Sequence, residues 1–407
     1  IGGAPRGPMT GAGGAAPRRP GLRRVLTFWP LVLYGLSVIV GAGIYVAIGA
    51  VISRAGHAAP LSFLIAGIAA GLTGVCYAEL AGRFPEASGG VAYVRRGFGS
   101  DRLAQLAGTA ITVAVAVAAA SIAHGAARYL AILLPVSTPA LTAMLIVGFT
   151  AVAMLGVRES VGLAAAMGVI ELAGLAAATA AGLAAAPDYR LAGLLPADLA
   201  GWHGALAGAF IAFFAFIGFE TLANLAEEVK NPQRTVPRGI IGAVAASIAI
   251  YVAVALAAVL ADTGPAAPLL DMFEGRGASV FAAVGAIAVA NGVLVQIVML
   301  GRLFYGMAGN GELPSMLAHV SAGTGVPAPA TVLAGAIVLA AAMLVPFERL
   351  LVLTNAITLG VFFVVDLALW RVQRREPAAA GAFTAPRWVP PLAAAFALAL
   401  LLAEILA

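Results

Sequence analysis

Residues 213–220 read Phe213-Phe214-Ala215-Phe216-Ile217-Gly218-Phe219-Glu220 and stand inside an apolar run that covers 203–227. Glycine weakens a helix, and an ionisable side chain at membrane depth is costly and points to function. The stretch therefore predicts a helix that crosses a membrane and is interrupted halfway. The alternative is an aromatic stripe in a helical core, with a glutamate that bonds a neighbouring helix.

A second interruption is predicted at Val40-Gly41-Ala42-Gly43-Ile44, in the middle of the apolar run 28–53. Backbone groups freed at membrane depth are tolerated only where they line a cavity or are buried in protein. Free N–H groups at the start of a half-helix would suit a carboxylate. The alternative is a glycine notch for close helix packing.

The chain around these two stretches is apolar nearly throughout. Of 407 residues, 62% are hydrophobic and 10% are charged, and the mean hydropathy is +1.02. Soluble domains have roughly 45–50% apolar and about 25% charged residues. The composition excludes a soluble domain and a disordered chain, and the single cysteine excludes a disulfide scaffold. It predicts an all-α polytopic membrane protein with about eleven transmembrane helices, in the runs 28–53, 60–83, 103–124, 138–157, 161–186, 203–227, 237–261, 278–308, 328–346, 349–370 and 388–406.

The distribution of positive charge predicts the orientation of these helices. With a cytoplasmic N-terminus, 18 of the 23 Lys and Arg residues fall on the cytoplasmic side, as the positive-inside rule requires. Eleven spans place the C-terminus outside. The net charge of +5 is then a topology signal. We expect a multi-pass protein of the cytoplasmic (inner) membrane, with the lipid bilayer and not nucleic acid as its partner.

The spacing of the two interruptions predicts the domain organisation. They lie in the first and sixth spans, and such matching breaks indicate a transporter built from inverted repeats. We expect a disordered cytoplasmic tail over 1–22 and a transporter core over 23–370, with repeats at about 28–186 and 203–370. Residues 371–407 are expected to form a cytoplasmic loop and a peripheral eleventh helix.

Several motifs resemble the amino acid–polyamine–organocation (APC) superfamily of permeases, and within it the amino acid permease family. The resemblance covers nearly the whole chain after Gly21. It implies a LeuT-type 5+5 inverted-repeat fold, with helices 1 and 6 broken, and secondary transport of amino acids. The motifs that carry it are Gly41–Ile44, Cys76–Leu80, Ser88–Val94, Phe213–Glu220, Ala226–Arg234, Leu303–Ala308 and Gly311–Pro314.

The resemblance also implies a binding site. The substrate carboxylate would meet backbone N–H groups of the first break, and the ammonium would meet backbone carbonyls of the second. Phe214 occupies the position of an aromatic gate in related exchangers; simple core packing is the alternative. The implied substrate-binding residues are Gly41, Ala42, Gly43, Ile44, Phe214, Ala215 and Ile217.

Two carboxylates are candidates for proton coupling. Glu220 directly follows the second break, where a related exchanger family uses a glutamate in its response to pH. Glu171 is surrounded by apolar residues in the fifth span, where many sodium-independent members of the resembled superfamily carry a lysine instead. Burial of an unpaired carboxyl favours its protonated form, so a proton could accompany the substrate. The alternatives for Glu171 are a Na⁺ site, which we consider less favoured, and a structural hydrogen bond.

Other polar residues receive more ordinary interpretations. Glu79 is expected to pair with Arg83 at the cytoplasmic edge, and Asp366 to lie at the membrane interface near Arg371. Asn291, Gln296, Thr354 and Asn355 are polar groups that could face a central cavity or bond neighbouring helices. No catalytic residue, metal site or cofactor is predicted, because no nucleophile–base pair or histidine pair is present in the sequence.

The expected function is secondary active transport of amino acids, as proton-coupled symport by alternating access. The largely apolar spans favour a neutral or apolar amino acid as substrate. Two alternatives stay open. One is an exchanger of amino acids or amines that takes a cationic amino acid or a polyamine-like substrate. The other is a non-transporting sensor on the same fold. The sequence does not indicate an oligomeric state.

Overall fold

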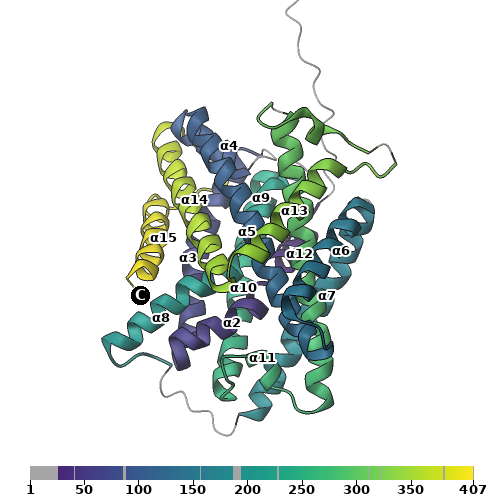
Figure 1. The fold of residues 1–407 in the computed structure, drawn as a ribbon. Helices are drawn as coiled ribbons and strands as arrows, with labels where there is room; N and C mark the ends of the chain where they lie inside the picture. Colours follow the sequence, from purple (N-terminus) through teal and green to yellow (C-terminus); the bar gives the residue numbers. More distant parts are fainter. Residues whose placement is uncertain are drawn as a thin grey trace, which may run out of the picture.

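The computed structural model describes residues 26–40, 42–85, 89–155, 157–186, 194–226, 229–309, 311–321, 323–378 and 381–406. For Ala42 and for 157–166 only the backbone is described. The predicted tail over 1–22 lies outside these residues, as does Gly41. Within them the regular structure is helical (Figure 1), apart from one isolated β-bridge between Leu26 and Val229.

Helices occupy all eleven apolar runs of the sequence. Two runs are each divided between two helices, at the positions where interruptions are predicted. The helices in these runs are α1 (Phe28–Ile39) with α2 (Ala42–Ala55), α3 (Ala59–Arg83), α5 (Asp101–Leu133), α6 (Thr138–Leu155), α7 (Val157–Ala185), α8 (Leu199–Ala212) with α9 (Glu220–Asn224), α10 (Pro232–Leu260), α12 (Arg276–Gly309), α13 (Ala328–Leu344), α14 (Phe347–Arg375) and α15 (Val389–Ile405).

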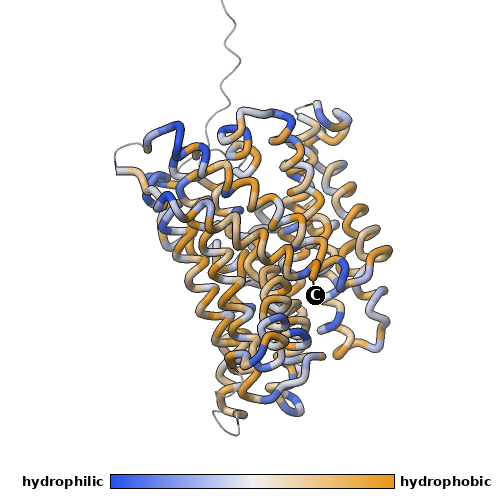
Figure 2. Tube along the Cα trace, turned by 90° about the vertical axis from the view of Figure 1, so that its left-hand side faces the viewer, coloured by the Kyte–Doolittle hydropathy of each residue, from blue (hydrophilic) through white to orange (hydrophobic). Residues whose placement is uncertain are grey.

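Among the described residues, eight helical stretches are long and apolar enough to cross a membrane. The helices α1, α13 and α15 are apolar but have 12, 17 and 17 residues. The helices α2 and α3 form one stretch, Gly43–Arg83, because the 3₁₀ turn Gly56–Ala58 joins them without a loop. The apolar residues occupy the middle of the bundle and the hydrophilic residues gather toward its two ends (Figure 2).

Some helices fall outside the predicted spans. The helix α4 (Gly89–Phe98) lies between α3 and α5 at one end of the bundle, and α11 (Pro268–Asp271) lies at the opposite end (Figure 1). The helix α4 carries the adjacent residues Arg95 and Arg96, which are exposed. These arginines interrupt its apolar pattern, so the search for continuous apolar runs missed it.

Small residues allow the helices to approach closely, as the composition indicates. A methyl group built on Gly67 of α3 would lie 2.6 Å from the Ile248 side chain of α10. One built on Gly285 of α12 would lie 2.7 Å from the Tyr129 ring of α5. Helix pairs that are distant in the chain thus contact each other through glycine.

A buried polar network joins α3 to the loop between α14 and α15. The predicted ion pair between Glu79 and Arg83 forms, although the Glu79 side chain is fully buried rather than at an edge. The other Glu79 carboxylate oxygen accepts hydrogen bonds from the Ala385 N–H at 2.8 Å and from Gln373 Nε2 at 2.7 Å. Arg83 donates to the Glu376 carbonyl oxygen at 3.0 Å. The network fixes this loop against the bundle.

Candidate functional site

The two interruptions lie against each other in space. A methyl group on Gly43, at the start of α2, would lie 2.5 Å from the Ala215 Cα of the 3₁₀ turn Phe213–Phe216. One on Gly218 would lie 3.2 Å from the Val38 carbonyl oxygen near the end of α1. Gly218 also has a φ of +129°, which side chains rarely permit. Both glycines are therefore needed for contact between the two backbones.

Tyr251 of α10 connects the two interruptions. Its hydroxyl oxygen lies 2.6 Å from the Ile39 carbonyl oxygen of α1 and 2.8 Å from the Ala215 carbonyl oxygen. Its single proton can serve either acceptor. The ring packs on Phe216 and Phe63, with centroid distances of 4.9 and 5.9 Å. Tyr251 was not among the residues predicted for the site. A tyrosine halfway along an apolar span is nevertheless a usable signal, because tyrosine favours the membrane interface.

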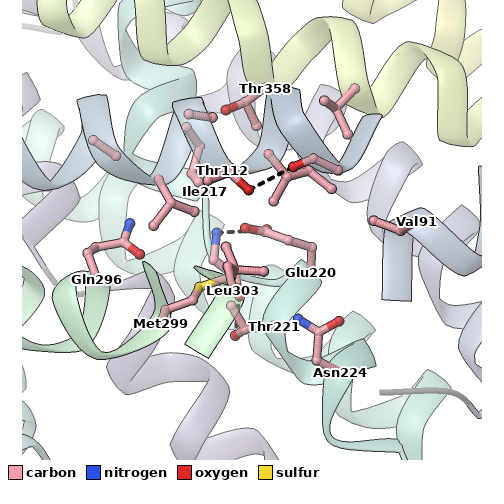
Figure 3. Close-up of a pocket in the computed structure, with 18 of the residues that line it drawn as sticks. Val91, Thr112, Ile217, Glu220, Thr221, Asn224, Gln296, Met299, Leu303 and Thr358 are labelled. Carbon is pink, nitrogen blue, oxygen red and sulfur yellow. Dashed lines mark hydrogen bonds between the residues drawn. The ribbon is translucent and has the colours of Figure 1, made fainter. Parts of the chain in front are cut away.

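A cavity of about 450 Å³ opens beside the two interruptions. Residues of the breaks and of α5, α12 and α14 line it, and it extends to exposed charged residues at one end, Arg95, Arg302 and Glu312. This mouth is on the predicted cytoplasmic side. Figure 3 shows polar side chains from several helices pointing into the cavity, including Glu220, Thr221, Asn224 and Gln296.

The implied substrate-binding residues have different positions relative to the cavity. Gly43, Phe214 and Ile217 line it. Ile44 and Ala215 are fully buried and are absent from its wall. Gly41 lies outside the described residues, and nothing is described of the Ala42 side chain. The backbone N–H groups in the first turn of α2 have no acceptor within the helix, as at any helix start.

The backbone carbonyls of the second break are partly engaged. The Ala215 carbonyl accepts from Tyr251, and the Phe214 carbonyl accepts from the Ile217 N–H at 3.4 Å. Within the described part of the chain, the Ile217 carbonyl has no such bond. Of the three predicted ammonium acceptors, Ile217 thus has the free oxygen in this conformation.

Glu220 reaches the cavity from the first residue of α9. Its Oε2 accepts a hydrogen bond from the Gly218 N–H at 2.9 Å (Figure 3). The adjacent Thr221 hydroxyl donates to the Gly218 carbonyl at 2.6 Å. These bonds hold the carboxyl at the second break, where a bound solute would meet it. The structure thus brings Glu220 to the cavity wall together with Gly43, Phe214 and Ile217.

Glu171 is separate from the cavity. Its side chain on α7 is fully buried, and neither carboxyl oxygen has a hydrogen-bond partner among the described residues. The Asn291 side chain of α12 lies close to this carboxyl and also lines the cavity. The Glu171 backbone carbonyl accepts from the Tyr45 hydroxyl at 3.0 Å. Glu171 therefore contacts α2 through Tyr45 and lies close to the cavity residue Asn291, but it does not line the cavity itself.

The remaining polar candidates divide between the cavity and helix packing. Asn291, Gln296 and Thr354 line the cavity, whereas Asn355 Nδ2 donates to the Phe210 carbonyl at 2.7 Å. The prediction that Asp366 lies at the membrane interface is wrong. Asp366 is fully buried, and its Oδ2 accepts from the Thr73 hydroxyl at 3.0 Å. The reason is that α14 continues to Arg375, beyond the predicted end at 370, so Asp366 lies deeper in the bundle.

Aromatic residues pack together on the side of the first break that is opposite to the mouth of the cavity. The helix α2 leads away from the end that holds α4 (Figure 1). Its Tyr45 ring packs on Tyr129 and on Phe281, with centroid distances of 6.0 and 6.1 Å, and Phe281 stacks on Phe273 at 4.7 Å. Helices α2, α5 and α12 are thereby packed together at this end.

Comparisons with known proteins find relatives that match most of this chain. The family profile described as amino acid permease matches residues 26–407. The chain is 31% identical to cationic amino acid transporter 9, chloroplastic, of Arabidopsis thaliana, over 74% of this chain and 58% of that protein. It is 30% identical to cationic amino acid transporter 3, mitochondrial, of the same plant, over 88% of this chain and 63% of that protein. It is 30% identical to the methylthioribose transporter of Bacillus subtilis, over 90% of this chain and 84% of that protein. The chain thus spans about three fifths of the length of these plant relatives.

Proposed function

Since this chain belongs to the amino acid permease family of the APC superfamily, we propose that it is a proton-coupled symporter of amino acids in the cytoplasmic membrane. Membership places the chain among transporters rather than enzymes. In this proposal the helices form a LeuT-type fold. Two inverted repeats, α1–α7 and α8–α14, each begin with an interrupted helix. Transport proceeds by alternating access, with the mouth described above as the cytoplasmic opening.

The backbone contact between the two interruptions, in the wall of a cavity, is the observation that carries this proposal. An amino acid has a carboxylate and an ammonium on one carbon, so its site needs donors and acceptors a few ångströms apart. The first turn of α2 offers N–H groups, which suit the carboxylate. The Ile217 carbonyl offers an acceptor for the ammonium. Gly43 and Ile217 both line the cavity, so one small zwitterion could contact both interruptions.

The cavity wall favours a neutral or apolar side chain on the substrate. Val115 and Ile122 of α5 and Met299 and Leu303 of α12 contribute apolar surface to it. A second candidate is a cationic amino acid. The position of Glu220 in the wall favours that candidate, because a carboxylate can pair with an ammonium or guanidinium group. The names of the plant relatives favour it as well.

Glu171 and Glu220 support proton coupling in different ways. Glu171 is buried, and no ion pair involves it among the described residues. An ionised carboxylate in such surroundings is strongly disfavoured. Glu220 lies in the cavity and can respond directly to a bound solute. A Na⁺ ion at Glu171 is the less favoured alternative.

Uptake into proteoliposomes tests the proposal. Radiolabelled neutral and cationic amino acids are compared with and without an inward proton gradient, in the presence and absence of Na⁺. We expect uptake that rises with the proton gradient and ignores Na⁺. Trans-stimulation without a response to the gradient would indicate an exchanger. No uptake and no exchange of any amino acid would contradict the proposal and leave a sensor or a carrier of other amines.

The variant Glu220→Gln separates the two substrate classes. Glutamine keeps the size and a hydrogen-bond acceptor for the Gly218 N–H but removes the charge. If the substrate is cationic, uptake of lysine and arginine falls sharply while any uptake of leucine persists. If the substrate is neutral, leucine uptake remains, and only its pH dependence can change.

A further inference from the structure

Asp366 is a buried carboxyl that the proposed transport cycle does not use. It lies on α14, and its side chain is fully buried against α3. The Thr73 hydroxyl of α3 donates to Oδ2 at 3.0 Å, and the Cys76 thiol of the same helix lies beside the carboxyl. Oδ1 has no hydrogen-bond partner among the described residues. One carboxyl oxygen thus remains unpartnered in a closed, largely apolar interface.

The charged groups around Asp366 do not offer a counter-charge. On its own helix, Arg371 lies over the Phe98 ring, 4.9 Å from the ring centroid. On α3, Glu79 is already paired with Arg83. Within the described residues, no ion pair involves Asp366. Burial of an ionised carboxylate without a cation is strongly unfavourable, so the neutral, protonated form fits this packing.

Tyr77 of α3 lines the cavity, and both Asp366 and Glu220 lie near it, although Asp366 does not itself line the cavity. The Tyr77 ring packs on Phe219, Phe362 and Tyr93, with centroid distances of 5.7, 5.5 and 5.8 Å. Phe219 belongs to the second interruption and Phe362 lies one turn before Asp366 on α14. A movement of the second interruption relative to α14 would therefore open a path between Asp366 and the cavity water.

The two helices that enclose Asp366 both contact the second interruption. A methyl group on Gly67 of α3 would contact Ile248 of α10 and Phe216 of the second interruption, at 2.6 and 3.1 Å. The helix α14 packs closely on α4, where a methyl group on Gly97 would lie 2.5 Å from Ala368. Its Phe362 ring also packs on Phe219 of the second interruption, with a centroid distance of 5.1 Å. A movement of the second interruption therefore alters contacts of both α3 and α14 around Asp366.

We propose that Asp366 is a second proton-binding site, which holds a proton while α3 and α14 are packed together and releases it when they part. The proposal rests on the proposed function, since it assigns a transported proton to the α3–α14 contact. In the packed state the proton remains on the carboxyl, and Thr73 donates to Oδ2. When the contact opens, water hydrates the carboxyl and accepts the proton.

Infrared spectroscopy of the purified protein tests proton binding without reference to transport. Wild type, Asp366→Asn and Thr73→Val are compared in H₂O and D₂O at neutral pH. We expect a carbonyl band of a protonated carboxyl that Asp366→Asn lacks and that shifts in frequency in Thr73→Val, because that variant removes the hydrogen bond. Slow shift of this band in D₂O would report opening of the contact. A wild-type spectrum without an Asp366-dependent band, or a band that Thr73→Val leaves unmoved, would overturn the proposal.

Proton flux measures the role of this site in transport. Proteoliposomes that contain a pH-sensitive dye are supplied with leucine or lysine, and proton entry is compared with radiolabel entry. We expect fewer protons per substrate in Asp366→Asn and an unchanged ratio in Thr73→Val. If wild type couples protons and Asp366→Asn keeps both its ratio and its pH profile, the inference fails while the proposed function stands. If wild type moves no protons with either substrate, the proposed function fails, and the infrared comparison still decides whether Asp366 holds a proton.

Discussion

Two glutamates that look alike in the sequence have different surroundings in the structure. Glu220 accepts a backbone hydrogen bond and lines the cavity, whereas Glu171 is enclosed without a hydrogen bond to its carboxyl oxygens. Among the described residues, the Asn291 side chain, which lines the cavity, lies close to the Glu171 carboxyl, and the Glu171 backbone carbonyl accepts from Tyr45. A group shielded in this way can change its charge without competing with the substrate for the same atoms.

Replacement of Glu171 by glutamine should uncouple uptake from pH. Glutamine has nearly the same volume and cannot release a proton, so substrate uptake should persist but lose its response to an inward proton gradient. Uptake by proteoliposomes at several external pH values measures this response. Glu348→Gln is a suitable control, because the Glu348 side chain is 76% exposed. An unchanged pH profile in Glu171→Gln would make this residue structural.

Replacement of Gly43 by leucine should abolish uptake while leaving membrane insertion intact. Even the first carbon of a side chain would lie 2.5 Å from the Ala215 Cα, so the two interruptions must move apart. Such overpacking costs about 1–3 kcal/mol, and it also displaces the N–H groups of α2. Gly71→Leu on α3 is the matched control, since nothing lies within 4 Å of a methyl group there. Normal uptake by Gly43→Leu would remove the first interruption from the site.

The interrupted helices show how far local sequence determines structure. Both breaks were predictable, because Gly41 and Gly43 lie in one apolar run, and Gly218 and Glu220 in another. The connection through Tyr251 was not predictable. A helix that is apolar on all faces gives no periodic signal to show which face meets which neighbour. The position of Asp366 was predicted wrongly for a different reason, because α14 continues past the predicted end at 370 to Arg375.

Replacement of Tyr251 by phenylalanine should slow transport without unfolding the bundle. The ring contacts with Phe63 and Phe216 remain, but the Ile39 and Ala215 carbonyls lose their shared donor. An unsatisfied buried acceptor costs roughly 1–3 kcal/mol, which corresponds to a loss on the order of tenfold or more in the affected step. Initial uptake rates and melting of the purified protein are compared with those of Tyr305→Phe, whose side chain is exposed. Equal rates in the two variants would show that the bridge is dispensable.

At the scale of the whole molecule, the cavity opens at the end of the bundle that carries Arg95 and Arg302. At the opposite end, Tyr45, Tyr129, Phe281 and Phe273 pack against one another. With the predicted orientation, this is a conformation open to the cytoplasm. Orientation itself depends on charge counted over many short segments, so it follows from the sequence better than any side-chain contact does.

Cysteine labelling of intact cells measures the orientation and the opening together. Gln105→Cys places a thiol at the mouth of the cavity, and Leu195→Cys places one at a position that is 71% exposed on the predicted outer side. The native Cys76 is fully buried and should give little background. We expect a membrane-impermeant maleimide to label Leu195→Cys in intact cells, and Gln105→Cys only after permeabilisation. The reverse pattern would contradict the predicted topology.

The ion pair of α3 has a consequence for the order of events during synthesis. Glu79 finally bonds Gln373 of α14 and Ala385 of the loop before α15, some three hundred positions later in the chain. When α3 leaves the ribosome, those partners do not yet exist, and a lone ionised side chain in an inserting helix is costly. Arg83 stands one turn away and forms the ion pair within the same helix. The helix thus carries its own neutralising partner into the bilayer, and the later bonds to Glu79 form when the last helix joins the bundle.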